Sequence, residues 1–201
     1  PIPVLINGGA SSVGMYSVQI AKRAGLFVVA TASKRNHDRV KALGADAVVD
    51  YTEKDWPEQV RKLTGDKLEH AFDCISEKET LHSVAAAISS KGGHVVCILP
   101  RKQDELDAGS NVKVESTIVY TVFGRDLSKT AYKAFDNTEP EKLAADKASW
   151  EKYLTQLPED LKSGKVVPNA IRERGGLDDL HAGFEDQRTG KVSAEKLVYT
   201  V

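Results

Sequence analysis

The sequence of 201 residues contains few of the residues that build disulfide-rich or metal-binding proteins. It has two cysteines, Cys74 and Cys97, and each lies inside an apolar segment (AFDCI and HVVCIL). Such segments bury free thiols in a core, so we expect two ordinary core cysteines and no disulfide. The five histidines are scattered, whereas a zinc site needs about four ligands at short spacings. We therefore expect no metal site.

An excess of charge and a long apolar run are also missing. The chain has 28 Lys and Arg against 29 Asp and Glu, a formal net charge of −1. This balance gives no electrostatic reason to expect binding to nucleic acid or to an anionic membrane. No segment reaches the roughly 18 apolar residues of a membrane-spanning helix, and the first residues lack the layout of a signal peptide. We expect a cytoplasmic globular protein.

The chain also lacks an initiator methionine, and its only methionine is Met15. Its first residues already form an apolar run, VLIN, that is typical of a buried strand. Because complete proteins seldom begin directly in a central strand, we expect this chain to be one part of a longer protein.

A regular alternation of short apolar strands and amphipathic helices fills residues 4–99. The expected strands are 4–7, 26–31, 47–51, 70–75 and 94–99, and the expected helices are 13–24, 36–43, 53–63 and 78–89. Glycine follows each of these helices. Apolar strands that are joined by helical crossovers are typical of a parallel sheet covered on both faces. The pattern predicts an α/β fold: a doubly wound parallel Rossmann sheet with helices on both faces.

The pattern changes after Pro100. We expect a surface loop at 101–111, a sixth strand at 112–124, a helix at 148–163, a strand at 166–173, a helix at 177–188 and a final strand at 195–201. The pattern thus divides the chain into a Rossmann domain, residues 1–165, and a C-terminal strand–helix–strand tail, residues 166–201.

A glycine-rich turn, NGGASSVG, joins the first strand to the first helix. Gly9, Ser11 and Gly14 occupy the three positions of the dinucleotide fingerprint G-x-G-x-x-G, with serine in the middle. Gly9 lets the backbone turn, and Gly14 lets the helix pack close to the strand. Free N–H groups and the helix dipole at such a turn favour an anion. We predict a pyrophosphate site here; the alternative is an ordinary strand-to-helix turn.

No Asp or Glu occurs between Gly8 and His37. NAD-selective sites place an acid about 20 residues after the turn, where it binds the ribose 2′-hydroxyl. This chain instead has Ser33, Lys34, Arg35 and Asn36 after its second strand. Because hydroxyl donors and cations bind a 2′-phosphate, the sequence favours NADP(H) over NAD. A solvated basic helix start is the alternative.

Four segments resemble the zinc-independent medium-chain dehydrogenase/reductases: NGGASSVGMYSVQIAKRAG, ATASKRNHDRVKALGADAVVDY, AFDCIS and YTVFG. The sequence is most similar to the fungal branch of trans-acting enoyl reductases of polyketide synthesis and TOXD-like proteins, and its tail GKVSAEKLVY is similar as well. The resemblance covers nearly all of residues 4–201. The family's N-terminal GroES-like domain, which forms the other wall of the substrate cleft, is not in this sequence.

The resemblance implies a set of cofactor-binding residues. The turn Ala10, Ser11, Ser12 and Val13 would hold the pyrophosphate between Gly9 and Gly14. The adenosine 2′-phosphate would lie among Ser33, Lys34, Arg35 and Asn36, with Tyr51 beside it and the adenine. Ile98 and Leu99 would line the nicotinamide, and Val192 and Ser193 would close the site from the tail.

For the substrate, the resemblance implies contacts from Thr121, Val122, Phe123 and Gly124, near the nicotinamide. No residue of this chain is expected to act as a catalytic acid. The final strands normally pack on the missing domain, so we expect them to lack their usual partners.

The function that the resemblance implies is an NADPH-dependent oxidoreductase that reduces an activated carbon–carbon double bond. Its substrate would be an acyl thioester or another small molecule, and a polyketide synthase is an expected partner. The alternatives are a quinone or alkenal reductase of the same superfamily and a non-catalytic NADPH-binding module. Alone, the 201 residues should bind cofactor, turn over poorly and self-associate through open strand edges.

Overall fold

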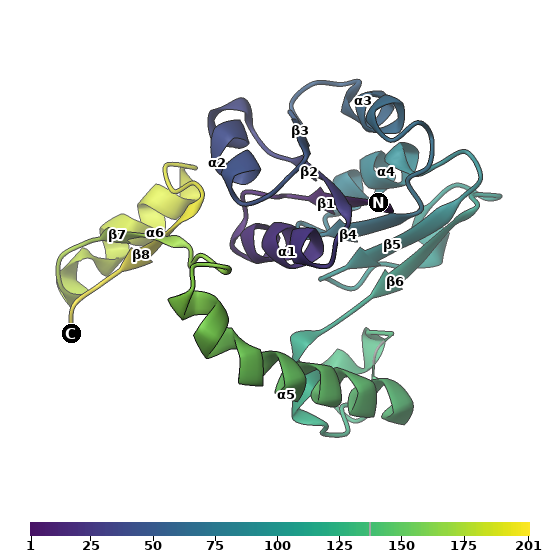
Figure 1. Ribbon diagram of the computed structural model, residues 1–201. Coiled ribbons are helices and arrows are strands. Elements are labelled where there is room, and N and C mark those ends of the chain that lie inside the picture. The colour runs from purple at the N-terminus through teal and green to yellow at the C-terminus, as the bar shows by residue number, and fades with distance from the viewer. Residues whose placement is uncertain (137) are drawn as a thin grey trace.

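A six-stranded parallel sheet lies at the centre of the protein (Figure 1). The structure is a computed structural model that describes residues 1–136 and 138–201. The strand order is β3-β2-β1-β4-β5-β6. The strands are β1 (Pro3–Asn7), β2 (Phe27–Thr31), β3 (Ala47–Val49), β4 (His70–Asp73), β5 (Gly93–Cys97) and β6 (Val112–Ser116). All neighbours pair in parallel, which confirms the predicted doubly wound fold.

Helices cover both faces of this sheet, as the apolar strands require. They are α1 (Ser12–Arg23) and α2 (His37–Ala42) on one face, and α3 (Trp56–Leu63) and α4 (Lys78–Ala87) on the other. One core cluster joins the strands to Val18 and Val40 of the first pair of helices. The other joins them to Val60 and Leu81 of the second pair. The two apolar layers fix the sheet between the helices.

Both cysteines are core residues, as predicted. Cys74 belongs to the cluster under α1, and Cys97 belongs to the cluster under α4. Burial raises the pKa of each thiol to about 12. Neither thiol is therefore ionised near neutral pH, and neither is activated as a nucleophile.

The sixth strand is shorter than predicted. It ends at Ser116, and a 3₁₀ segment, η3 (Val119–Phe123), replaces the expected strand up to residue 124. Its partner β5 ends at Cys97, which is paired with Ser116. Beyond that point the described residues offer no neighbouring strand, and the backbone of this segment bonds to itself instead, as in the bond from the Gly124 N–H to the Thr121 carbonyl. The predicted end of this strand at residue 124 is therefore wrong.

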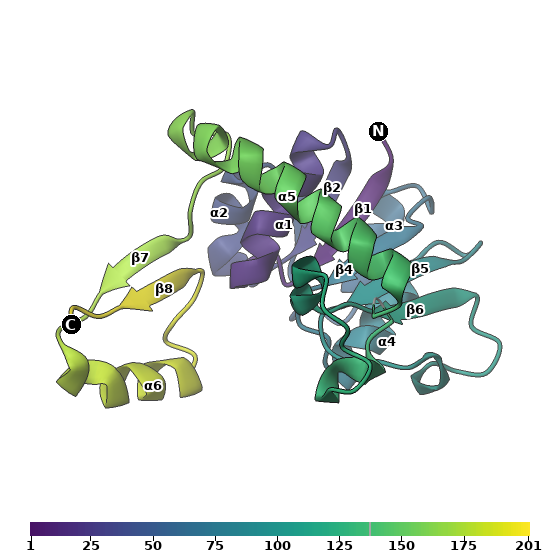
Figure 2. The same ribbon diagram turned by 90° about the horizontal axis from the view of Figure 1, so that it is seen from below.

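The long helix α5 (Pro140–Lys162) begins earlier than the predicted residue 148. Pro140 lies in its first turn, where a proline is well tolerated. Figure 2 shows α5 crossing the molecule in front of α1. An ion pair of 2.7 Å between Arg23 of α1 and the buried Asp160 ties the two helices together. No helix in the two described ranges is long and apolar enough to cross a membrane.

The tail forms a small unit beside the main sheet (Figures 1 and 2). It contains β7 (Ala170–Glu173), η5 (Leu177–Asp179), α6 (Leu180–Arg188) and β8 (Glu195–Val198). β7 and β8 pair with each other in parallel. The α6 crossover lets each strand pair with one edge of the other. The expectation that these strands lack their usual partners stays a prediction.

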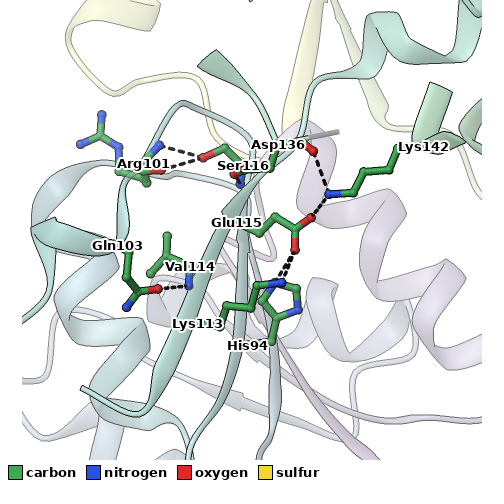
Figure 3. A network of polar contacts seen from close by, with 9 residues as sticks. All are labelled: His94, Arg101, Gln103, Lys113, Val114, Glu115, Ser116, Asp136 and Lys142. Carbon is green, nitrogen blue, oxygen red and sulfur yellow. Dashed lines mark hydrogen bonds and ion pairs between the residues drawn. The ribbon is translucent and has the colours of Figure 1, made fainter. Parts of the chain in front are cut away.

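A polar network joins β5, β6 and the start of α5 (Figure 3). The Glu115 carboxylate lies 2.9 Å from the Lys142 ammonium, 3.2 Å from the Lys113 ammonium and 3.0 Å from His94 Nε2. Hydrogen bonds from the two lysines lower the pKa of Glu115 to about 2. Lys142 also donates to the Asp136 carbonyl, so the network fastens the first turn of α5 to the sheet edge.

Replacing Glu115 with Gln should lower the free energy of unfolding at pH 7 by about 1–2 kcal/mol, because the ion pairs with Lys113 and Lys142 are lost. The loss is no larger because solvent screens these exposed lysines. A carboxylate with a depressed pKa stabilises the fold above its unfolded pKa, near 4.5, and loses this effect as the pH falls through about 2. Urea unfolding at pH 7 and at pH 2 checks this expectation: the difference from wild type should nearly vanish at pH 2.

The matched control is Glu151→Gln on the exposed face of α5, where the pair with Lys147 spans 3.8 Å. It should change stability by less than about 0.5 kcal/mol. An equal effect of the two substitutions at pH 7 would show that the Glu115 network does not fasten α5.

Candidate cofactor site

The glycine turn places a helix N-terminus at the carboxyl edge of the sheet. β1 ends at Asn7, and α1 begins at Ser12. Ser11 caps the helix: its side chain accepts a hydrogen bond of 3.0 Å from the Gly14 N–H. The N–H groups of Ser12 and Val13 occupy the first helical turn, where a helix has no backbone acceptor of its own. This end of α1 can therefore hold an anion.

Gly14 is required by a close approach between α1 and the turn. A Cβ atom at this position would lie 2.1 Å from the Gly8 carbonyl oxygen and 2.9 Å from the Gly9 Cα atom. Backbone atoms cannot move aside as a flexible side chain can, so any other residue would push the helix away. The third glycine of the fingerprint thus has the packing role that the sequence predicted.

A chain of hydrogen bonds supports the turn from below. The Gly8 N–H donates to Thr31 Oγ1 (2.8 Å), and the Thr31 hydroxyl donates to Asn7 Oδ1 (2.6 Å). Asn7 Nδ2 then donates to the Asp73 carboxylate (2.7 Å). These bonds connect the carboxyl ends of β2, β1 and β4. They fix the first residue of the turn relative to all three strands.

Asp73 is fully buried, and it accepts three further hydrogen bonds. The donors are the backbone N–H groups of Ile75 and Ser76 and the hydroxyl of Thr80, each at 3.0 Å. A buried carboxylate without such donors would be strongly destabilising. The loop after β4 and the first turn of α4 are therefore held to the same point as the glycine turn.

A cavity of about 640 Å³ opens above this network. Its volume lies within the roughly 300–1,000 Å³ that is usual for ligand sites. Nine residues predicted from the sequence lie on its wall: Ala10, Ser11, Ser12, Ser33, Arg35, Asn36, Tyr51, Val192 and Ser193. The cavity therefore brings together the glycine turn, the segment after β2 and the tail.

Polar contacts join the tail to the segment after β2, η1 (Lys34–Asn36). Asn36 Nδ2 donates to Ser193 Oγ (2.9 Å) and to Ser33 Oγ (3.2 Å). Arg35 Nη2 lies 3.5 Å from the Gly190 carbonyl oxygen. This corner of the cavity has hydroxyl groups and one lining cation, as a phosphate subsite requires.

Other predicted site residues do not line this cavity. Gly9, Val13, Gly14, Lys34, Ile98 and Leu99 lie off its wall. The proposed substrate residues Thr121, Val122, Phe123 and Gly124 lie on or next to η3, which packs against α5. Within η3, Thr121 is buried and its hydroxyl donates to Asp146 of α5 (2.6 Å), whereas Phe123 is exposed. Their substrate role stays a prediction.

Sequence reasoning missed part of the cavity wall. The missed residues include Asn7, Thr31, Trp56, Ile75, Glu77, Glu79, Thr80, Ser83 and Glu195. Asn7 and Thr31 are the last residues of their strands, at the edge where parallel sheets bind ligands; this position was a usable signal. The α4 residues gave none, because a polar first turn is usual for any helix.

Among residues 1–136 and 138–201, no group of three or more His, Cys, Asp and Glu side chains is arranged to hold a metal ion. The described part of the chain therefore offers no ligand set for zinc.

The model of one protein family, described as zinc-binding dehydrogenase, matches residues 12–139. The chain belongs to this family. The match starts at the first residue of α1 and extends past β6. The family name refers to zinc, but the described residues do not fit that ion.

Two relatives of this chain are fungal proteins. The chain is 34% identical over 201 residues to trans-enoyl reductase mpsG of Macrophomina phaseolina, with 99% of this chain and 55% of the relative covered. It is also 34% identical over 203 residues to trans-enoyl reductase ACTTS2 of Alternaria alternata, with 98% and 54% covered. The chain spans about half the length of the curated relatives it matches.

A solved structure shares the fold. The putative NADPH:quinone reductase from Bacillus thuringiensis has a TM-score of 0.74 to this chain at 17% identity, with 99% of this chain and 56% of that protein covered. At this level of identity the likeness supports the Rossmann-type fold alone.

Gly14→Ala should destabilise the protein by about 3 kcal/mol, because the added methyl group meets backbone on two sides. The control is Gly25→Ala, at the end of α1. Gly25 has φ +79° and open space around its missing side chain, so only the left-handed backbone penalty of about 1 kcal/mol applies. Thermal or urea unfolding measures both variants. Equal losses would mean that the helix can retreat freely from the turn.

Proposed function

We propose that this chain is the NADP(H)-binding part of an oxidoreductase of the trans-enoyl reductase type, which reduces an activated carbon–carbon double bond. The observation that carries the proposal is the cavity, in which a fingerprint turn and a basic, acid-free segment face one space. The 34% identity to two trans-enoyl reductases supports the reaction type.

The residues on the wall fit a dinucleotide phosphate. The N-terminus of α1 and the Ser12 hydroxyl suit the pyrophosphate, because they offer donors and no carboxylate. At the other corner, Arg35, Ser33 and Asn36 suit a 2′-phosphate. Tyr51 is half-exposed on the wall near this corner and offers a ring face to an adenine.

When bound, reduced nicotinamide supplies a hydride. The residues of this chain would contribute binding and orientation, in line with the usual division of work in cofactor enzymes. Ile98 and Leu99 follow β5 at the carboxyl edge of the sheet, which supports the prediction that they line the nicotinamide. The polyketide synthase partner and the cytoplasmic location stay predictions.

A quinone or alkenal reductase is the second candidate. The likeness to the putative quinone reductase favours it only through the fold. The two candidates differ in the substrate. The residues predicted to contact the substrate do not line the cavity, so the cavity does not distinguish between the two candidates.

NADPH should bind at least about 10-fold more tightly than NADH, because a charge-assisted phosphate contact contributes about 1.5–3 kcal/mol. Arg35→Ala should remove most of this preference by weakening NADPH binding and leaving NADH binding unchanged. Calorimetric titration with both cofactors measures the preference. Lys41→Ala, an exposed cation of α2 outside the cavity, is the control and should alter neither affinity. Equal affinities of the wild type for both cofactors would contradict the NADP(H) assignment.

The reaction is tested in the full-length protein that carries this chain. Oxidation of NADPH should be faster with crotonyl-type thioesters than with quinones, at about 1 per second or more. Faster oxidation with quinones would support the second candidate. Cofactor binding without turnover of either substrate would support a non-catalytic module. The isolated 201 residues should bind NADPH and turn over slowly, because hydride transfer needs the alkene held about 3–3.5 Å from its donor.

A further inference from the structure

We infer that Asn169, in the segment just before β7, is a positioning residue of the pyrophosphate site that acts by directing the Ser12 hydroxyl. This inference rests on the proposed function. Asn169 Nδ2 donates a hydrogen bond of 2.7 Å to Ser12 Oγ across 157 residues of sequence. Ser12 lies on the cavity wall, whereas Asn169 does not.

The direction of this hydrogen bond decides what Ser12 can offer to a ligand. A serine hydroxyl has one proton to donate and two lone pairs that accept. Because one lone pair already accepts from the Asn169 amide, the proton is directed away from that amide. The hydroxyl then joins the N–H groups of the first turn of α1 as a donor, which is the polarity that a phosphate requires.

The segment that carries Asn169 is fixed to α1 by its backbone. Gln19 of α1 is buried and forms two hydrogen bonds with one tail residue: its Nε2 donates to the Val167 carbonyl (3.1 Å), and its Oε1 accepts from the Val167 N–H (2.7 Å). Val166 beside it is also buried. A side-chain amide that pairs with both backbone groups sets the register of the segment. The Asn169 side chain therefore reaches Ser12 and not another residue of the turn.

The oxygen of the Asn169 amide takes no part in fastening the tail to α1. Its Oδ1 atom is buried and has no hydrogen-bond partner in the described part of the chain. A buried amide oxygen without a donor costs free energy. The contact that this amide does make is the one to Ser12, and its chemical consequence is the donor direction of that hydroxyl.

The inference is tested by a double-mutant cycle on NADPH affinity, measured by calorimetry with the 201-residue chain. Asn169→Ala and Ser12→Ala should each weaken binding by roughly 3- to 10-fold, the range of one neutral hydrogen bond. If Asn169 acts through Ser12, the double variant should bind no more weakly than Ser12→Ala alone. Ser193→Ala, on another part of the cavity wall, is the comparison. Its fold-loss of NADPH affinity should multiply with that of Ser12→Ala in the double variant.

A second variant separates the direction of the Ser12 hydroxyl from a loss of contact between the tail and α1. Asn169→Asp has the same shape, but its carboxylate accepts from Ser12. It should therefore reverse the hydroxyl and add negative charge beside the pyrophosphate. NADPH binding should fall further than in Asn169→Ala, by about 10-fold or more relative to wild type. Thermal unfolding of each variant without ligand shows that the fold is kept; if Asn169→Ala does not fold, Asn169→Asp decides.

Two results overturn the inference while leaving the proposed function intact: unchanged NADPH affinity in Asn169→Asp, or effects of Asn169→Ala and Ser12→Ala that multiply in the double variant. Failure of the wild-type chain to bind NADPH overturns the proposed function, and this inference with it.

Discussion

The buried carboxylate of Asp73 sets the constraint on which the site depends. A charge in a protein interior needs several donors around it, and here they come from separate elements: the Asn7 side chain at the end of β1, two backbone N–H groups after β4 and the Thr80 hydroxyl in α4. Thr31 extends the set to β2 and to the first residue of the glycine turn. One carboxylate thus holds three strand ends and two loops in register beneath the cavity.

The sequence predicted the central sheet well because the signals for it are local. Apolar runs, helical spacing and the glycine after each helix fall within a few residues of one another, and Gly14 could be interpreted from its place in the turn. Features that depend on distant partners were not predicted. β6 ends where its neighbour β5 ends, a fact that no residue of the 112–124 segment records. The Asn7, Thr31 and Asp73 network joins strands that are remote in sequence, and each residue alone looks like an ordinary strand end.

The candidate site likewise contains residues that the sequence predicted and residues that it did not. The fingerprint, the acid-free stretch and the resemblance placed Ser12, Asn36, Tyr51 and Ser193 in regions that lie together on the cavity wall. Residues behind the wall gave no signal. Asn169 contacts Ser12 only because Gln19 fixes the backbone of the tail against α1. A contact of this kind depends on the register between two elements, and a single sequence does not encode that register in any short motif.

The residues of the cavity wall are synthesised at different times, because they come from distant parts of the chain. The six strands are complete once the ribosome has passed Ser116, and domains generally fold as units during synthesis, with the N-terminal part first. The tail residue that bonds to Asn36 lies 157 residues further along the chain. A nascent chain would therefore contain a folded sheet, with the glycine turn exposed, before translation supplies the tail residues of the cavity wall. The complete cavity would then form late in the maturation of this protein.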